Sequence, residues 1–189
     1  MSITVSDPST PHLGGNYMHG DLACMSFTMW ELLIKRYAIR SVLDIGCGEG
    51  HAVRFFHGLG VFAHGIEGLR RNVERAVVPI TLHDLTAGPY TMPVDMTLSI
   101  EVAEHIEERF VDHYLDTLAN GKIVVMTHAV PGQGGFHHVN CQPSEYWTAK
   151  MEARGYALDP HTQFWRDKSK ADGHFTYFSN SGLVFKRRS

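Results

Sequence analysis

Short apolar runs alternate along the chain with stretches in which apolar residues recur every three or four positions, and these patterns predict strands and helices. The predicted strands are residues 41–45, 61–67, 79–85, 95–101, 122–129, 156–160 and 182–187. The predicted helices are residues 25–37, 51–59 and 106–118, and another that begins at Pro143. Residues 1–20 show neither period and are expected to form a flexible N-terminal arm.

The alternation of strands with helices predicts an α/β fold. Short buried strands separated by helices are typical of a mainly parallel sheet covered by helices on both faces. No repeat or internal linker interrupts residues 21–189, so we expect these residues to form a single domain.

Composition narrows the class of partner. The chain has 17 Lys+Arg against 20 Asp+Glu, a formal net charge of -3, so its charge makes nucleic acid an unfavoured partner. No signal peptide is recognisable, and no run approaches the roughly 18 apolar residues that a membrane helix needs. Three widely spaced cysteines, Cys24, Cys47 and Cys141, are typical of reduced thiols. We expect a cytoplasmic protein without membrane insertion, and no pattern indicates an oligomeric state.

The turn after the first strand carries the clearest candidate chemistry. In SVLDIGCGEG (residues 41–50) an apolar run reaches an acid, Asp44, and three glycines follow at alternate positions. Ligands of open α/β sheets bind at the carboxyl ends of the strands, where this turn lies. The dinucleotide fingerprint G-x-G-x-x-G needs a third glycine where this chain has His51. NAD is therefore disfavoured, which leaves another ligand or a purely structural turn.

Acidic residues end the next three strands. Glu67 follows the glycine turn by roughly 20 residues, where an acid can accept hydrogen bonds from both hydroxyls of a ribose. Asp84 comes at the end of the third strand, where a carboxylate can accept from the amino group of an adenine. Glu101 ends the fourth. Together these acids predict an adenosine-binding edge of the sheet.

Four motifs resemble those of the class I S-adenosylmethionine-dependent methyltransferases. They are VLDIGCGEG (42–50), GIE (65–67), HDL (83–85) and DMTLSIEVAEHI (95–106). The resemblance implies a Rossmann-like class I methyltransferase fold with a mainly parallel seven-stranded sheet, and S-adenosylmethionine as the cofactor. The cofactor-binding residues that it implies are Asp44, Gly46, Cys47, Gly48, Glu67, Gly68, Asp84, Leu85 and Glu101. The turn suits a sulfonium cation better than a phosphate, because it carries two acids and no basic residue.

The segment EVAEH (101–105) bears on the acceptor, and we expect it to enter a helix with Glu101 and Glu104 or His105 on one face. Glu-x-x-Glu-His at this place resembles the metal-binding segment of the ubiquinone-pathway O-methyltransferases and of the small-RNA 3′-terminal 2′-O-methyltransferases. That resemblance implies Mg²⁺ or Mn²⁺ on Glu101, Glu104, His105 and His138, where the metal would orient and acidify a hydroxyl. Without a metal, His105 or His138 would serve as general base in a catalytic set with Glu101. The same pentapeptide also occurs in relatives not known to use a metal, and His138 can equally be a packing residue.

These patterns predict a methyltransferase that acts on the hydroxyl of a small molecule, a sugar or a lipid-linked acceptor. Two alternatives stay open: a metal-dependent RNA ribose 2′-O-methyltransferase and a non-catalytic S-adenosylmethionine-binding regulatory protein. Amino-group methylation of DNA or RNA is disfavoured, because no Asn/Asp-Pro-Pro-aromatic motif follows the fourth strand. The acceptor is expected between the glycine-rich loop at residues 131–147 and the arm, which brings Tyr17 and His19.

Overall fold

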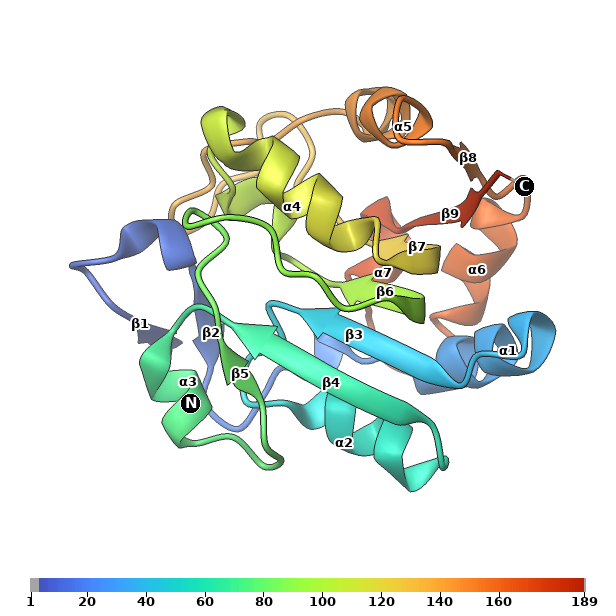
Figure 1. Ribbon diagram of the computed structural model, residues 1–189, viewed down its shortest axis with the longest axis horizontal. Coiled ribbons are helices and arrows are strands. Elements are labelled where there is room, and N and C mark those ends of the chain that lie inside the picture. Colours follow the sequence, from blue (N-terminus) through green and yellow to red (C-terminus); the bar gives the residue numbers. More distant parts are fainter. Residues whose placement is uncertain (1–3, 189) are drawn as a thin grey trace.

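The computed structural model describes residues 4–188, and a seven-stranded sheet forms its centre (Figure 1). In spatial order the strands are β5 (Thr81–Leu82), β4 (Phe62–Glu67), β3 (Ser41–Ile45), β6 (Val94–Ser99), β7 (Gly121–Met126), β9 (Leu183–Arg187) and β8 (Tyr156–Leu158). Neighbouring strands from β5 to β7 are parallel, whereas β9 runs antiparallel to both β7 and β8. The predicted α/β fold with a mainly parallel sheet is confirmed, with the refinement that the sheet is mixed.

Helices cover both faces of this sheet. The α-helices are α1 (Phe27–Tyr37), α2 (His51–Gly58), α3 (Arg70–Glu74), α4 (Val111–Leu118), α5 (Ser144–Glu152), α6 (Thr162–Lys168) and α7 (Phe178–Ser181). One apolar core includes Trp30 of α1 and Phe56 of α2, and the other includes Tyr114 of α4 and Trp147 of α5. Because the central strands are buried on both faces, they read in the sequence as continuous apolar runs. Within residues 4–188 no helix combines the length and the apolarity needed to cross a bilayer.

Several predicted boundaries differ from the structure. The strand predicted at 79–85 is only the two residues of β5: Pro79 has no backbone N–H for a ladder, and the partner strand β4 ends at Glu67, which pairs with Leu82. The helix predicted at 106–118 is split into a 3-10 turn, η4 (Glu108–Phe110), and α4. Pro143 is the cap that precedes α5 rather than its first residue. The helices α3 and α6 span 5 and 7 residues, too few to show a helical period in the sequence.

The N-terminal arm contains a small hairpin. Its strands β1 (Thr4–Ser6) and β2 (Gly15–Tyr17) pair antiparallel, and the 3-10 turns η1 (Pro11–Leu13) and η2 (Leu22–Cys24) lie on either side of β2. Strands of three residues are too short to show a period-2 pattern, so the hairpin was not predicted. Figure 1 shows it beyond the carboxyl ends of β3 and β4. The flexibility of the arm stays a prediction.

Candidate active site

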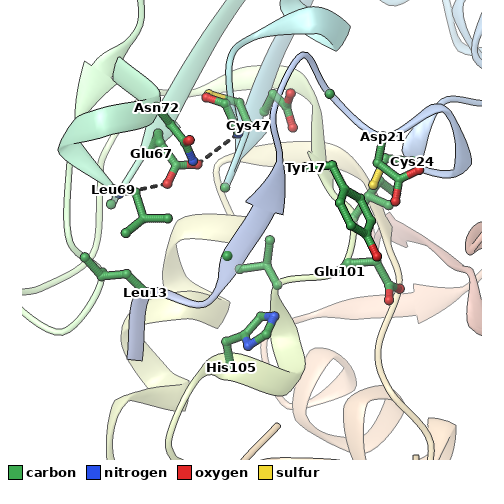
Figure 2. A pocket seen from close by; sticks show the side chains of 18 of the residues that line it. Leu13, Tyr17, Asp21, Cys24, Cys47, Glu67, Leu69, Asn72, Glu101 and His105 are labelled. Carbon is green, nitrogen blue, oxygen red and sulfur yellow. Dashed lines mark hydrogen bonds between the residues drawn. The ribbon is translucent and has the colours of Figure 1, made fainter. Parts of the chain in front are cut away.

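A cavity of about 790 Å³ lies at the carboxyl ends of β3, β4 and β6 (Figure 2). The strand β3 pairs with β4 on one side and with β6 on the other, so the order of strands reverses here, which is where open α/β sheets bind ligands. All the residues predicted to bind the cofactor line the cavity: Asp44, Gly46, Cys47, Gly48, Glu67, Gly68, Asp84, Leu85 and Glu101. Glu104, His105 and His138 line it as well. The structure thus brings every predicted site residue to one cavity.

Backbone conformation explains the glycines of the turn between β3 and α2. Gly46, Gly48 and Gly50 have φ of 71°, 55° and 80°, a region that other residues rarely adopt. A Cβ on Gly46 would also lie 2.4 Å from a methyl carbon of Val102. The missing side chain therefore lets the turn pack directly against the segment that follows β6.

Two buried acids line the floor of the cavity. Glu67 accepts hydrogen bonds from the backbone N–H of Gly48 at 2.9 Å and of Leu69 at 2.8 Å, so it fixes the glycine turn as well as facing the cavity (Figure 2). Burial raises the pKa of Glu67 to about 7. Burial, and then the charge of Glu67, raises the pKa of Asp44 to about 7. Cations that enter this part of the cavity would favour the ionised form of both acids.

The arm covers the far side of the same cavity. His12 Nε2 lies 3.0 Å from Asp84 Oδ2, and a Cβ on Gly68 would meet the Leu13 side chain at 2.6 Å. The backbone N–H of His19 donates to a carboxylate oxygen of Glu49 at 3.1 Å. Asp84, predicted to accept from an adenine, is therefore already engaged on one oxygen by the arm.

The segment after β6 departs from the predicted helix. Glu101 has a φ of 57°, and its backbone N–H donates to Thr127 Oγ1 at 2.7 Å while that hydroxyl donates to its carboxylate at 2.9 Å. This left-handed residue lies two positions after the end of β6, and only a 3-10 turn, η3 (Ala103–His105), follows. The expectation that Glu101 and Glu104 share a helical face is wrong, because no α-helix forms here.

Three of the four predicted metal ligands form a tight group. Single ligand atoms of Glu104, His105 and His138 all lie within 4.8 Å of one another. Glu104 is fully buried, and neither of its carboxylate oxygens has a hydrogen-bond partner in the described chain. The fourth, Glu101, is outside this group and accepts from Thr127. One carboxylate and two imidazoles are a donor set that suits a divalent transition metal, so the residues fit such an ion.

The protonation of this group follows from its burial. Burial and the charge of Glu101 raise the pKa of Glu104 well above its usual range. Burial lowers the pKa of His105 to about 4, so its ring is neutral at pH 7. His105 Nδ1 lies 3.2 Å from the carbonyl oxygen of His137, which can only accept. The proton of the neutral ring is therefore on Nδ1, and Nε2 keeps a lone pair for a proton or a metal.

Hydrogen bonds hold the glycine-rich loop over η3. The backbone N–H groups of Val139 and Asn140 both donate to the Glu104 carbonyl oxygen, at 2.9 and 3.0 Å. The Asn140 side chain donates to the Ile106 carbonyl oxygen at 3.0 Å. The loop therefore places His138 beside His105, with ring centroids 5.1 Å apart.

Several other residues of the cavity could not be selected from local sequence patterns. His12, Leu13, Asp21, Cys24 and Tyr177 all line it. His12 and Leu13 come from the aperiodic arm, Asp21 and Cys24 from the short segment after it, and Tyr177 from the far end of the chain, so no local pattern connects them. The only signal was the density of histidine and glycine in residues 1–20.

A comparison with protein families decides between the ligands that this cavity could take. The sequence model of a family described as a methyltransferase domain matches residues 27–184. The chain belongs to this methyltransferase family. S-adenosylmethionine is the cofactor expected for this family. A comparison with curated protein sequences finds no match.

Solved structures of methyltransferases share the fold of this methyltransferase. A sugar N-methyltransferase from Streptoalloteichus sp. ATCC 53650 superposes with a TM-score of 0.65 at 15% identity, covering 89% of each chain. A TehB-like methyltransferase from Corynebacterium glutamicum gives a TM-score of 0.60 at 16% identity, covering 86% of this chain and 87% of the other. The magnesium protoporphyrin IX methyltransferase from Synechocystis PCC 6803, solved with bound S-adenosylmethionine, gives 0.57 at 14% identity, covering 86% and 76%.

Proposed function

We propose that this methyltransferase transfers the methyl group of S-adenosylmethionine to a hydroxyl of a small molecule. The observation that carries the proposal is the single cavity, which has the glycine turn and Glu67 at one end and Glu101, His105 and His138 at the other. The first end suits the adenosyl and aminoacyl parts of the cofactor. The second end then surrounds the reacting methyl group and the acceptor.

The transfer needs positioning and the removal of one proton. The acceptor oxygen attacks the methyl carbon, the carbon–sulfur bond breaks with its electrons staying on sulfur, and the hydroxyl proton passes to a base. In-line positioning of this kind contributes up to about 7–11 kcal/mol. We assign the base to the Nε2 lone pair of His105, with His138 beside it, because a hydrogen-bonded Nδ1–H leaves that nitrogen free.

The residues lining the cavity support a small acceptor over RNA. Among residues 4–188, no lysine or arginine lines the cavity, so the phosphates of a polynucleotide would have no cation to contact there. The similar fold of the sugar N-methyltransferase is consistent with an acceptor of modest size.

The test of this proposal compares turnover with cofactor binding. Methyl transfer is first sought across a panel of hydroxylated metabolites, and no transfer at all would favour a non-catalytic cofactor-binding protein. With an acceptor found, His105→Ala and His138→Ala should each lower kcat at least about tenfold with unchanged affinity for S-adenosylmethionine. The matched control is His161→Ala, an exposed histidine outside the cavity. Equal losses of binding and turnover would show that the two histidines hold the fold instead.

A metal-assisted form of the same reaction is a second proposal, carried by the unpartnered Glu104 carboxylate between two imidazoles. Glu104, His105 and His138 would hold Mg²⁺ or Mn²⁺, with Glu101 adjacent. Such an ion, when bound, lowers the pKa of a hydroxyl that it contacts. Activity should then fall with a chelator and return with Mn²⁺, and Glu104→Gln should abolish Mn²⁺ binding measured by electron paramagnetic resonance. Full activity in metal-free protein would exclude this form of the mechanism.

A further inference from the structure

Among the described residues, the cavity of this methyltransferase is lined by many acids and by histidines, and by no lysine or arginine. Within residues 4–188 its lining contains seven carboxylates and no lysine or arginine. The carboxylates are Asp21, Asp44, Glu49, Glu67, Asp84, Glu101 and Glu104. An acceptor that carries a phosphate or carboxylate would therefore meet negative charge without a compensating cation.

Three of these acids form the acidic end of the cavity, which we define as Asp21, Glu101 and Glu104. The other four belong to the cofactor half: two lie in β3 and β4, and two are paired with Arg75 and His12. Of the residues assigned above to the acceptor, the acidic end contains Glu101, and its Glu104 lies beside the other two, His105 and His138. It also includes Asp21, to which neither the cofactor nor the transfer step gives a role.

Every hydrogen-bond donor that contacts the acidic end is uncharged. Asp21 accepts from the hydroxyl of Tyr177 at 3.0 Å and from the backbone N–H of Ala23 at 2.9 Å, and Glu101 accepts from a threonine hydroxyl. Glu104 is fully buried, no protein donor in the described part of the chain reaches its oxygens, and its side-chain neighbour is the carboxyl group of Glu101. A second carboxyl group beside Glu104 adds no compensating charge, so the ionised form of this pair needs a cation. The acidic end therefore suits a ligand that brings positive charge.

A metal ion bound by His105 and His138 would not be coordinated by Asp21. The group of potential ligands consists of Glu104, His105 and His138 and does not include Asp21. Figure 2 shows Asp21 on the arm, on the same side of the cavity as Tyr17, whereas His105 approaches from another side. Asp21 is thus a separate anionic contact at the acceptor end.

Apolar side chains surround this end of the cavity. Leu22 and Phe136 line it with 57% and 49% of their surfaces exposed, and Tyr17 lines it at 38%. Phe175 packs edge-on against Tyr177, with ring centroids 5.6 Å apart. Exposed apolar groups around an acidic interior suit a ligand with a positive group and an apolar body, since aromatic faces also attract cations.

We propose that Asp21 binds a positively charged nitrogen of the acceptor, so that the acceptor is an organic amine whose apolar part contacts Leu22 and Phe136. This inference rests on the proposed function, because it names the substrate class of the same site. The nitrogen is the group that is recognised, and a hydroxyl of the same molecule is the atom that receives the methyl group.

The test uses probes matched in shape and different in charge. Binding to the protein saturated with S-adenosylhomocysteine is measured by saturation-transfer NMR titration for two sets of three compounds. One set is tyramine, 4-ethylphenol and 3-(4-hydroxyphenyl)propionate, and the other is hexylamine, 1-hexanol and hexanoate. In at least one set the amine should bind about tenfold more tightly than the neutral compound, and the carboxylate should bind most weakly.

Asp21→Asn removes the charge and keeps the shape, since an amide oxygen still accepts from Ala23 and the amide can still contact the Tyr177 hydroxyl. In this variant the ratio of the Kd of the neutral compound to the Kd of the amine should fall to about one. Asp172→Asn is the matched control: Asp172 also accepts from a backbone N–H and a hydroxyl, both of Thr28, but does not line the cavity. That variant should keep the wild-type preference.

Each remaining outcome counts against the amine proposal. It is overturned if the carboxylates bind as well as the amines, if Asp21→Asn leaves the preference unchanged, or if none of the six probes binds. Failure of S-adenosylhomocysteine itself to bind would overturn the proposed function instead, so the two failures are distinguishable.

Discussion

At the scale of single residues, this protein places ionisable groups where their charge is unfavourable until a ligand arrives. Asp44 and Glu67 are almost completely buried, and burial raises the pKa of each to about 7. Glu67 also accepts two backbone hydrogen bonds from the turn that it supports. The same side chain therefore shapes the glycine turn and faces the cavity, which we propose as the cofactor site.

Glu67→Gln should weaken binding of S-adenosylmethionine. The amide lacks the charge and one of the acceptor oxygens, so a loss of about 1.5–3 kcal/mol, roughly 10- to 100-fold in Kd, is expected. Isothermal titration calorimetry measures this change, with Glu74→Gln, an exposed acid of α3, as the control. An unchanged Kd would refute the ribose-binding role.

Cofactor affinity should rise as the pH rises from about 5.5 to about 8. In the empty protein Asp44 and Glu67 each have a pKa of about 7, so both are largely protonated at lower pH. A cationic cofactor favours their ionised forms. Binding below pH 7 should therefore release protons, seen in calorimetry as heats that depend on the buffer.

The same two acids make the stability of the empty protein depend on pH. Its free energy of unfolding should fall as the pH rises from about 4 to about 7, since the folded state binds more protons there than the unfolded state. Asp44→Asn should flatten both trends, and a cofactor affinity that falls with pH would contradict the assignment.

At the scale of elements, the site depends on how η3 and the glycine-rich loop are joined. The loop contributes His138, and its backbone donates twice to the carbonyl oxygen of Glu104. Asn140 adds a side-chain hydrogen bond to the carbonyl of Ile106 and is 3% exposed. These contacts fix the distance between the two histidines of the acceptor end.

Asn140→Ala should loosen this junction. The buried Ile106 carbonyl loses its donor, so the free energy of unfolding should fall by about 1–3 kcal/mol. Turnover should fall by at least about tenfold with S-adenosylhomocysteine affinity retained, because the cofactor half of the cavity is made by other elements. Denaturant unfolding and kinetics measure both effects, with the exposed Asn180→Ala as the control. Retained turnover would show that the junction does not position the histidines.

At the scale of the whole molecule, the cavity is bounded by segments from both ends of the chain. The arm supplies His12, the segment just after the arm supplies Asp21, the sheet supplies Asp44 and Glu67, and the last quarter supplies Tyr177. A ligand bound in the cavity would contact the N-terminal segments, the sheet and the last quarter of the chain at the same time. Binding should therefore stabilise the fold as a unit.

S-adenosylhomocysteine at about 100 times its Kd should stabilise the protein by about 2.7 kcal/mol. For a chain of this size that corresponds to a rise in Tm of roughly 5–10 °C. Differential scanning fluorimetry measures the shift. NAD at the same concentration should cause none, and an equal shift with NAD would contradict the specificity of the turn for this cofactor.

Local patterns in the sequence predicted the half of the site that follows the strands. Asp44, Glu67 and Asp84 lie at or just beyond the ends of parallel strands, and parallel strands necessarily bring such ends to one edge. The glycines of the turn were equally recognisable, because the positive φ that they adopt is a local demand of the chain. The predicted helix after β6 was wrong because Glu101, which is not a glycine, adopts a positive φ that the neighbouring hydroxyl of Thr127 helps to hold.

The sequence by itself thus determined the fold class, the edge of the sheet at which the acids gather and the residues of the glycine turn, since each depends on periodicity or on the conformation of a few consecutive residues. Only the tertiary structure decided what surrounds the acceptor. His12 and Asp84 are 72 residues apart and Asp21 and Tyr177 are 156 apart, yet each pair is joined by a hydrogen bond. Contacts at such separations follow from how the arm and the last helices pack on the sheet, and packing leaves no period in the sequence.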